Sequence, residues 1–251
     1  MRYALIDSLR GFSLVSMVLY HYCWDLVYLS GRYLPGYTST PGYIWQQSIC
    51  WAFIFISGFS LTLAQRGKKR TAALKKALLL TALGMMITAV TTLFMPEDPI
   101  WFGVLFFLGA ATLIMPAFGN RTSLSAGTAF FLSLLLFAVS RNVPFGLLGF
   151  ERLTGPVLPP SLYTHGLWGA FLGFPYKNFI SADYFPLIPW IFLFSAGYFL
   201  GRALLKENEL PAIFTADCPP LSVIGKHSLL IYLIHQPVLL LVVPGYSPFV
   251  S

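Results

Sequence analysis

Residues 43–64, YIWQQSICWAFIFISGFSLTLA, contain no charged side chain. A helix needs ~20 predominantly apolar residues to cross the ~30 Å hydrocarbon core of a bilayer. This stretch is long enough, so it predicts a membrane-spanning helix. Six further apolar stretches meet the same criterion approximately: Leu9–Leu29, Leu74–Phe94, Ile100–Phe118, Leu124–Ser140, Phe185–Leu205 and Leu221–Val243. We therefore expect an all-α, polytopic transmembrane helix bundle with about seven spans.

The composition of the 251-residue chain agrees with this fold class. Hydrophobic residues make up 57% of it and charged residues only 10%, whereas soluble domains carry roughly 25% charged residues. We expect one integral membrane domain over residues 1–251. The net charge of +7 comes from short basic clusters between apolar stretches, a pattern typical of membrane topology and not of nucleic-acid binding. The three cysteines have no metal-ligand spacing, so no metal site is expected.

The basic residues predict the orientation. With a cytoplasmic N-terminus and seven crossings, only four of the 16 Lys and Arg residues lie outside, namely Arg32, Arg141, Arg152 and Lys177. Short cytoplasmic loops carry an excess of Lys and Arg. We expect a multi-pass protein of the cell inner (plasma) membrane with an external C-terminus.

The segment 141–184 does not fit a plain spanning helix, because it is rich in Gly, Pro and aromatic residues. Irregular backbone at membrane depth is tolerated only where protein or a wet cavity surrounds it. The segment is predicted to be a long external loop between the fifth and sixth spans. Within it, residues 162–174 are candidates for a re-entrant or further helical piece; an external loop that only packs on the bundle is the alternative.

Ionisable residues inside a spanning helix are functional candidates because their insertion is costly. His21 and Asp25 are four residues apart, so they lie on one helical face. A carboxylate at this spacing can orient an imidazole, which leaves its other nitrogen as a base. The structural alternative is that His21 bonds a backbone carbonyl and Asp25 marks the end of the span.

The last apolar stretch holds a second polar pair, His235 and Gln236, directly before Pro237. A proline inside a helix removes one backbone hydrogen bond and can kink the helix. His235 is expected at a depth similar to that of His21. The two histidines are therefore candidates for one shared cavity.

Cationic side chains at the inner surface are candidates for binding an anionic ligand. Arg10 is one candidate, although Asp7 is three residues away and can pair with it. The others form a cluster after the second span: Arg66, Lys68, Lys69 and Arg70. The cluster can equally hold the topology and contact anionic lipid. In the sixth span, Gly197 and Gly201 form a GxxxG motif that favours close helix packing and would permit a homodimer.

Six segments together resemble the heparan-α-glucosaminide N-acetyltransferase catalytic-domain family, which is grouped in a wider clan of membrane acyltransferases. They are 6–12 (IDSLRGF), 21–26 (HYCWDL), 53–61 (FIFISGFSL), 101–105 (WFGVL), 183–190 (DYFPLIPW) and 225–237 (GKHSLLIYLIHQP). The resemblance runs from end to end of the chain. No single segment is specific, but their order is.

The resemblance implies transfer of an acyl group, typically acetyl from acetyl-CoA, to a sugar or glycan across the membrane. His21 matches the histidine on which the family relies. The resemblance also implies that the basic residues at the inner membrane surface lie near the phosphates of acetyl-CoA. Asp183, Tyr184 and Trp190, at the external mouth, would contact the saccharide, and loop anchoring is the alternative for these three.

One departure from the family pattern concerns Phe106. Bacterial relatives commonly place a histidine here, and phenylalanine can neither carry nor relay a proton. Two further functions therefore stay open. One is a proton-coupled transporter or flippase for a lipid-linked glycan that uses His21, Asp25 and His235; the other is a non-catalytic membrane partner that keeps the family fold.

Overall fold

The fold is described from a computed structural model, which describes residues 3–65, 69–119, 121–205 and 209–243. Within them the longer helices are α1 (Ala4–Tyr28), α2 (Thr40–Ala64), α3 (Lys69–Phe94), α4 (Val104–Gly119), α5 (Ala126–Ser140), α7 (Leu187–Leu204) and α9 (Ser228–Val242). The shorter elements are η1 (Val143–Phe145), β1 (Leu147–Phe150), β2 (Leu153–Val157), η2 (Pro160–Thr164), α6 (Gly166–Leu172), η3 (Ala212–Thr215) and α8 (Pro219–Lys226). The predicted helical class is confirmed.

Each of the seven predicted apolar stretches overlaps one of the longer helices. In the described residues, four helices are long and apolar enough to cross a membrane, or five if the bent pair α8–α9 is one span. The four spans are Thr40–Ala64, Thr71–Phe94, Ala126–Phe145 and Leu187–Leu204. Helix α1 is not among the four because it contains polar residues. Helix α4 is not among them because it has only 16 residues. Seven crossings thus stay a prediction.

The chain divides into two compact units. One comprises Met1–Ile56 with Glu207–Ser251, and the other comprises Ser57–Lys206. Helix α2 continues from the first unit into the second. A single integral membrane domain over residues 1–251 stays a prediction.

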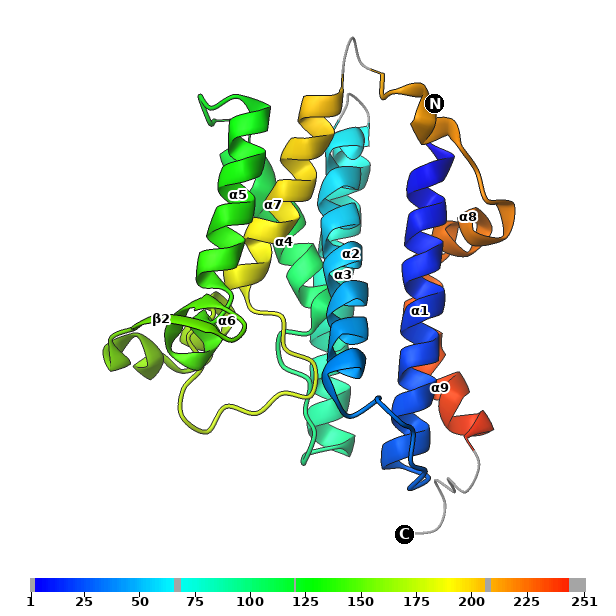
Figure 1. Cartoon of the computed structure of the whole chain (residues 1–251), viewed down its shortest axis with the longest axis vertical. Helices are drawn as coiled ribbons and strands as arrows, with labels where there is room; N and C mark the ends of the chain where they lie inside the picture. Colours follow the sequence, from blue (N-terminus) through cyan, green and yellow to red (C-terminus); the bar gives the residue numbers. More distant parts are fainter. Residues whose placement is uncertain (1–2, 66–68, 120, 206–208, 244–251) are drawn as a thin grey trace. The chain divides into compact units, whose positions relative to one another are not determined.

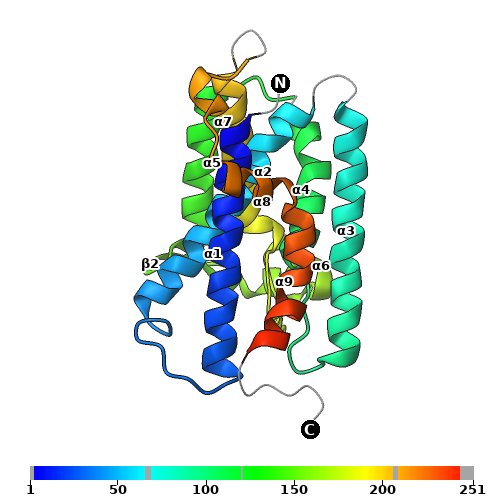
Figure 2. The ribbon, with the colours of Figure 1, turned by 90° about the vertical axis from the view of Figure 1, so that its right-hand side faces the viewer.

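In the first unit, α8 and α9 pack along α1 (Figures 1 and 2). Helix α1 buries Asp7, Gly11, Leu14 and Asp25, among others. Their spacing places these four residues on one helical face. The predicted span Leu221–Val243 is not one straight helix. It breaks at His227, and α8 and α9 meet there at 86°.

Two glycines allow α8 to cross α1 closely. A Cβ atom on Gly225 would lie 1.9 Å from the Asp7 carbonyl oxygen, and one on Gly11 would lie 1.9 Å from the Leu221 carbonyl oxygen. No side chain fits at either position unless the backbones separate. The crossing therefore depends on these two residues.

Replacement of Gly225 by alanine should destabilise the protein by about 1–3 kcal/mol, because an extra methyl group in a close-packed contact forces backbone shifts. The measurement is thermal unfolding in detergent. Gly127→Ala is the matched control: a Cβ atom there meets nothing within 4 Å, so its midpoint should not fall. Equal midpoints for Gly225→Ala and the wild type would contradict the packing described.

In the second unit, α7 packs against α4 and α5, and α3 packs against α4. Phe107 and Phe194 are almost fully buried, and their rings meet edge to face at 6.3 Å. Gly197 and Gly201 are buried in the chain, and a Cβ atom on Gly201 would meet Thr62 Oγ1 at 2.9 Å. The GxxxG motif thus serves packing within the chain, and its glycines do not offer the exposed face expected for a homodimer.

The segment between α5 and α7 is structured. Strands β1 and β2 pair antiparallel, and α6 occupies the stretch 162–174 in which a re-entrant or helical piece was predicted. Figure 1 shows the hairpin and α6 beside the ends of α5 and α7 that they connect.

Candidate active site

His21 on α1 and His235 on α9 lie in contact in the first unit. Their ring centroids are 4.8 Å apart, and the ring planes are inclined by 79°. Both positions occupy the middle turns of helices that pack together. The shared depth expected from the sequence thus corresponds to direct contact.

Each imidazole is fixed by a carbonyl of its own helix. His21 Nδ1 lies 2.9 Å from the Met17 carbonyl oxygen, and His235 Nδ1 lies 2.6 Å from the Tyr232 carbonyl oxygen. A carbonyl oxygen can only accept, so Nδ1 is the donor in both rings. In the neutral imidazole this leaves the lone pair on Nε2, which is the atom that can take a proton.

Asp25 binds Gln236 and not His21. Its carboxylate oxygen Oδ1 accepts a hydrogen bond of 2.8 Å from Gln236 Nε2, while the described hydrogen bond of the His21 ring goes to Met17. The expected orientation of His21 by Asp25 is therefore not the arrangement found; the carbonyl bond of the structural alternative is. Asp25, one turn beyond His21 on α1, instead binds the residue that follows His235 on α9.

Three buried polar atoms in this cluster have no hydrogen-bond partner among the described residues: Asp25 Oδ2, His235 Nε2 and Gln236 Oε1. All three are acceptors, given the His235 tautomer and the amide orientation that the bond to Asp25 requires. Asp25 is fully buried, and an unpaired buried acceptor is costly. The cluster is thus suited to a ligand that donates hydrogen bonds, such as a hydroxyl or amino group.

Aromatic residues support α1 behind the histidines. Trp45 Nε1 donates to Ser16 Oγ at 2.8 Å, and the Tyr37 hydroxyl donates to the Tyr20 carbonyl at 3.2 Å. Tyr37 precedes α2, and burial raises the pKa of its phenol above the usual range. The phenol therefore keeps its proton and remains a donor, which fixes the start of α2 on α1.

At the inner end of α1, Arg10 pairs with Asp7 at 3.1 Å. Among the predicted cofactor-binding residues, Arg66 and Lys68 lie outside the described residues. Lys69 and Arg70 begin α3, but their side chains also lie outside the described part. The role of the cationic residues stays a prediction.

The three predicted saccharide contacts lie in the second unit, where each one stabilises the fold. Asp183 Oδ2 accepts a hydrogen bond of 3.1 Å from Val104 N at the start of α4. The Tyr184 hydroxyl donates to the Ala170 carbonyl at 2.5 Å, and burial raises the pKa of this phenol. Trp190 is 5% exposed. These contacts are those that loop anchoring predicts.

Phe106 is part of an aromatic cluster. Its ring lies 5.4 Å from that of Phe102 and 5.8 Å from that of Phe171. A Cβ atom on Gly84 would lie 2.6 Å from Phe106 N, so α3 passes directly behind it. Phe106 is therefore a packing position in this structure.

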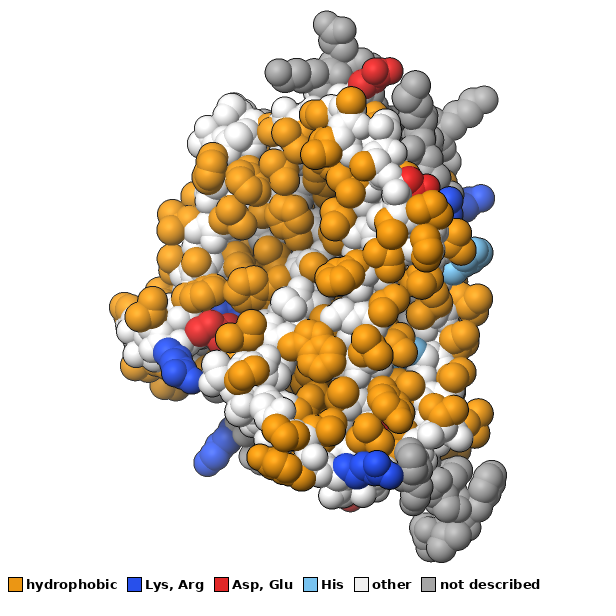
Figure 3. Space-filling model, turned by 45° about the vertical axis from the view of Figure 1, so that its right-hand side comes forward, with side chains coloured by type: hydrophobic (Ala, Val, Ile, Leu, Met, Phe, Trp, Pro, Cys, Tyr) orange, Lys and Arg blue, Asp and Glu red, His pale blue; other side chains and the backbone are white. Residues whose placement is uncertain are grey.

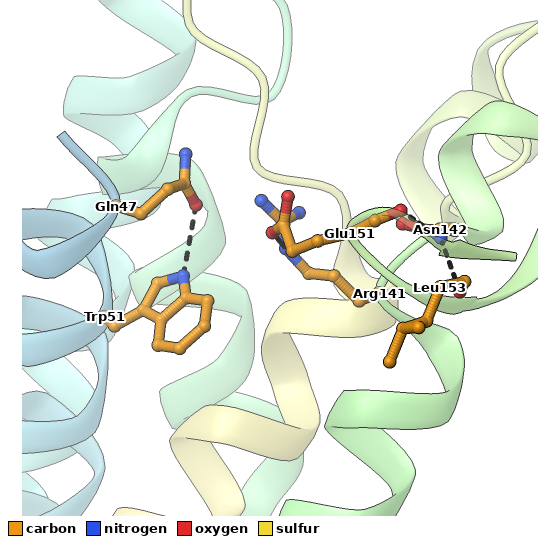
Figure 4. A network of polar contacts seen from close by, with 6 residues as sticks. All are labelled: Gln47, Trp51, Arg141, Asn142, Glu151 and Leu153. Carbon is orange, nitrogen blue, oxygen red and sulfur yellow. Dashed lines mark hydrogen bonds and ion pairs between the residues drawn. The ribbon is translucent and has the colours of Figure 1, made fainter. Parts of the chain in front are cut away.

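A partly buried ion pair in the second unit was not predicted from the sequence. Arg141 Nε donates to Glu151 Oε1 at 2.9 Å, and the guanidinium lies 4.9 Å from the centroid of the Trp190 ring. Asn142 Nδ2 binds the Glu151 carbonyl at 2.9 Å (Figure 4). Glu151 has a φ of 52°, which is uncommon for a residue with a side chain. This turn holds the hairpin on α5.

Glu151→Gln should lower the thermal midpoint, because it leaves the guanidinium of Arg141, 8% exposed, without its counter-charge. Breaking a fully buried pair costs 3–5 kcal/mol; the Glu151 side chain is 28% exposed, so we expect about 1–3 kcal/mol. Glu97→Gln, in an exposed turn, is the control. An unchanged midpoint for Glu151→Gln would show that the pair contributes nothing.

Comparison with known proteins agrees with this membrane fold. A family model described as heparan-alpha-glucosaminide N-acetyltransferase, catalytic, matches residues 2–237. The match covers nearly the whole chain, so the protein belongs to this family of acetyltransferase-type membrane enzymes. No curated protein and no solved structure gives a significant match.

Proposed function

We propose that this protein is a membrane-embedded acetyltransferase that moves an acetyl group from cytoplasmic acetyl-CoA to an external or envelope saccharide. The observation that carries the proposal is the α1–α9 cluster, in which the rings of His21 and His235 are in contact and the buried carboxylate of Asp25 binds the neighbouring Gln236. Membership of the family supplies the reaction type. The donor, the acceptor and the residue roles are the proposal's own content.

His21 acts as the general base. Its Nε2 takes the proton of the acceptor hydroxyl or amine while that oxygen or nitrogen forms a bond to the acetyl carbonyl carbon. The thioester C–S bond breaks, and His21 returns the proton to the sulfur of CoA. In the alternative, His21 Nε2 is itself acetylated and the acceptor attacks in a second step. The carbonyl bond to Nδ1 supports both, because it directs the reactive lone pair to Nε2.

His235, Gln236 and Asp25 bind the acceptor's attacking group. The three buried acceptor atoms favour a ligand that donates hydrogen bonds, as sugar hydroxyl and amino groups do. Asp25 and Gln236 also hold α1 against α9. In this arrangement Asp25 positions the site and does not orient the His21 ring directly.

The remaining predicted residues have a place in the proposal. With seven crossings and a cytoplasmic N-terminus, Arg10 and the cluster Arg66, Lys68, Lys69 and Arg70 lie where the phosphates of acetyl-CoA arrive. With the same topology, Asp183, Tyr184 and Trp190 face the external side, where a saccharide would arrive. Their polar atoms already serve the fold, so we expect them to contact the saccharide without reacting.

Acetyl-CoA and CoA should each raise the thermal midpoint of the purified protein. A ligand at 100 times its Kd that binds only the folded state adds about 2.7 kcal/mol. Arg10→Gln should reduce the shift, whereas Arg152→Gln, a substitution of an exposed external cation, should not. No shift with millimolar acetyl-CoA or CoA would count against the proposal.

Two other functions have an observation in their favour. A buried carboxylate beside two histidines also suits the proton relay of a transporter, which would move a lipid-linked glycan in proteoliposomes without consuming acetyl-CoA. The aromatic packing of Phe106 suits a non-catalytic partner, which would neither transfer acetyl nor move a glycan. An acetyl-transfer assay and a glycan-transport assay in proteoliposomes therefore separate the three functions.

A further inference from the structure

The segment between α5 and α7 exposes an unusual set of large apolar side chains. Five of them are between 65% and 77% exposed: Phe145, Leu153, Val157, Trp168 and Ile180. For comparison, Phe131, in the membrane span of α5, is 69% exposed. A water-soluble loop would rarely expose so many large apolar side chains. Some apolar medium must therefore contact this segment.

Helix lengths indicate what that medium is. Helix α5 alone has 15 residues, about 22 Å at ~1.5 Å per residue, and its candidate span reaches 20 residues only with the residues up to Phe145, about the ~30 Å of the hydrocarbon core. Helix α3 has 26 residues, about 39 Å. Within the second unit, Figures 1 and 2 show α3 continuing beyond the level at which α5 ends.

The hairpin and α6 thus lie at a level that α3 still crosses. At its end α3 exposes Leu93 and Phe94, 76% and 79% accessible, as lipid-facing residues do. The candidate span that begins with α5 also extends through the turn at Arg141 and Asn142 to Phe145. The exposed apolar face of the segment therefore continues the lipid-facing surface of the bundle.

The composition of the segment limits how deep it lies. Every residue of β2 is exposed, and an exposed strand edge is not tolerated in hydrocarbon. Arg152 and Lys177 are exposed and suit lipid phosphates. In α6, Trp168 is exposed while Gly169 and Ala170 are buried, and tryptophan is enriched at membrane–water interfaces. On the face in Figure 3, hydrophobic side chains cover most of the surface and charged ones lie near its margins.

We infer that residues 145–180 form an interfacial membrane-binding module, with Trp168 and its apolar neighbours inserted between the acyl chains and headgroups of one leaflet. With the predicted topology this is the external leaflet. The module is neither a solvated loop nor a spanning element. The inference rests on the membrane fold and is independent of acetyl transfer, so failure of the enzymatic assays would leave it standing.

The test measures the depth of a spin label at two module positions. The free cysteines Cys23, Cys50 and Cys218 are replaced by alanine, and Trp168→Cys and Ile180→Cys are labelled separately in phospholipid nanodiscs. Phe131→Cys is the lipid-facing reference and Asp98→Cys, in an exposed turn, is the aqueous reference. Each variant must keep the thermal midpoint of the cysteine-free protein; Val157→Cys replaces any that does not.

Oxygen should relax both module labels more than a water-soluble nickel chelate does. The difference between the two reagents should have the same sign as for the label at position 131. The inference is overturned if either label behaves like the aqueous reference. It is also overturned if neither reagent reaches a label, because protein and not lipid would then cover the module.

Discussion

Replacing His21 by alanine should lower the rate of acetyl transfer by a factor of ~10²–10⁴, the usual contribution of a general acid or base. The loss should appear in kcat, because His21 acts on the proton that moves in the transition state. The measurement is transfer of labelled acetyl from acetyl-CoA by the purified protein. The thermal shift with CoA should remain, since His21 is not placed at the phosphates.

His227→Ala is the matched control. His227 is exposed at the junction of α8 and α9 and has no place in the α1–α9 cluster, so transfer should stay near the wild-type rate. Wild-type transfer by His21→Ala would remove the catalytic assignment. Exchange of labelled CoA into acetyl-CoA without acceptor separates the two roles of His21: exchange indicates an acetylated histidine, and its absence indicates a base.

Gln236→Glu should cause the second large effect, because it places a second carboxylate against Asp25 at the hydrogen-bonding distance of 2.8 Å. Two like charges buried at this separation repel strongly. We expect a clear fall in the thermal midpoint and at least a tenfold loss of transfer. Both follow from separation of α9 from α1, which moves His235 away from His21.

The double variant Asp25→Asn/Gln236→Glu tests whether this pair is responsible. The asparagine amide can donate to the new carboxylate, so the hydrogen bond is restored in the opposite direction. The midpoint should recover by a coupling energy of about 1–3 kcal/mol. Additive losses in the double variant would mean that the two side chains do not act as a pair.

The sequence was sufficient for the helical class and for naming His21 and His235 as candidates for one cavity; their ring contact comes from the structure. Hydropathy depends only on composition along the chain, and the two histidines were placed at similar depth by counting residues from the membrane surface. The helices are found within a few residues of the predicted stretches. The division of Leu221–Val243 at His227 was not predicted, because an apolar stretch of spanning length does not reveal a bend.

The partner of Asp25 could not be predicted from spacing alone. Asp25 and His21 are four residues apart on one helix, but the residue that donates a hydrogen bond to the carboxylate is Gln236 on α9. Similarly, the Arg141–Glu151 pair depends on a hairpin and on an uncommon φ at Glu151. Both contacts arise from tertiary packing, which local sequence does not encode.

Acetyl transfer itself is the most direct test of the proposed function. Wild-type protein in nanodiscs is given acetyl-labelled acetyl-CoA and an oligosaccharide mixture from the cell envelope, with His21→Ala in parallel. We predict stoichiometric release of CoA and label on the saccharide for the wild type only. Folded wild-type protein that binds acetyl-CoA but leaves every saccharide unlabelled, or equal labelling with His21→Ala, would contradict a His21-dependent membrane acetyltransferase.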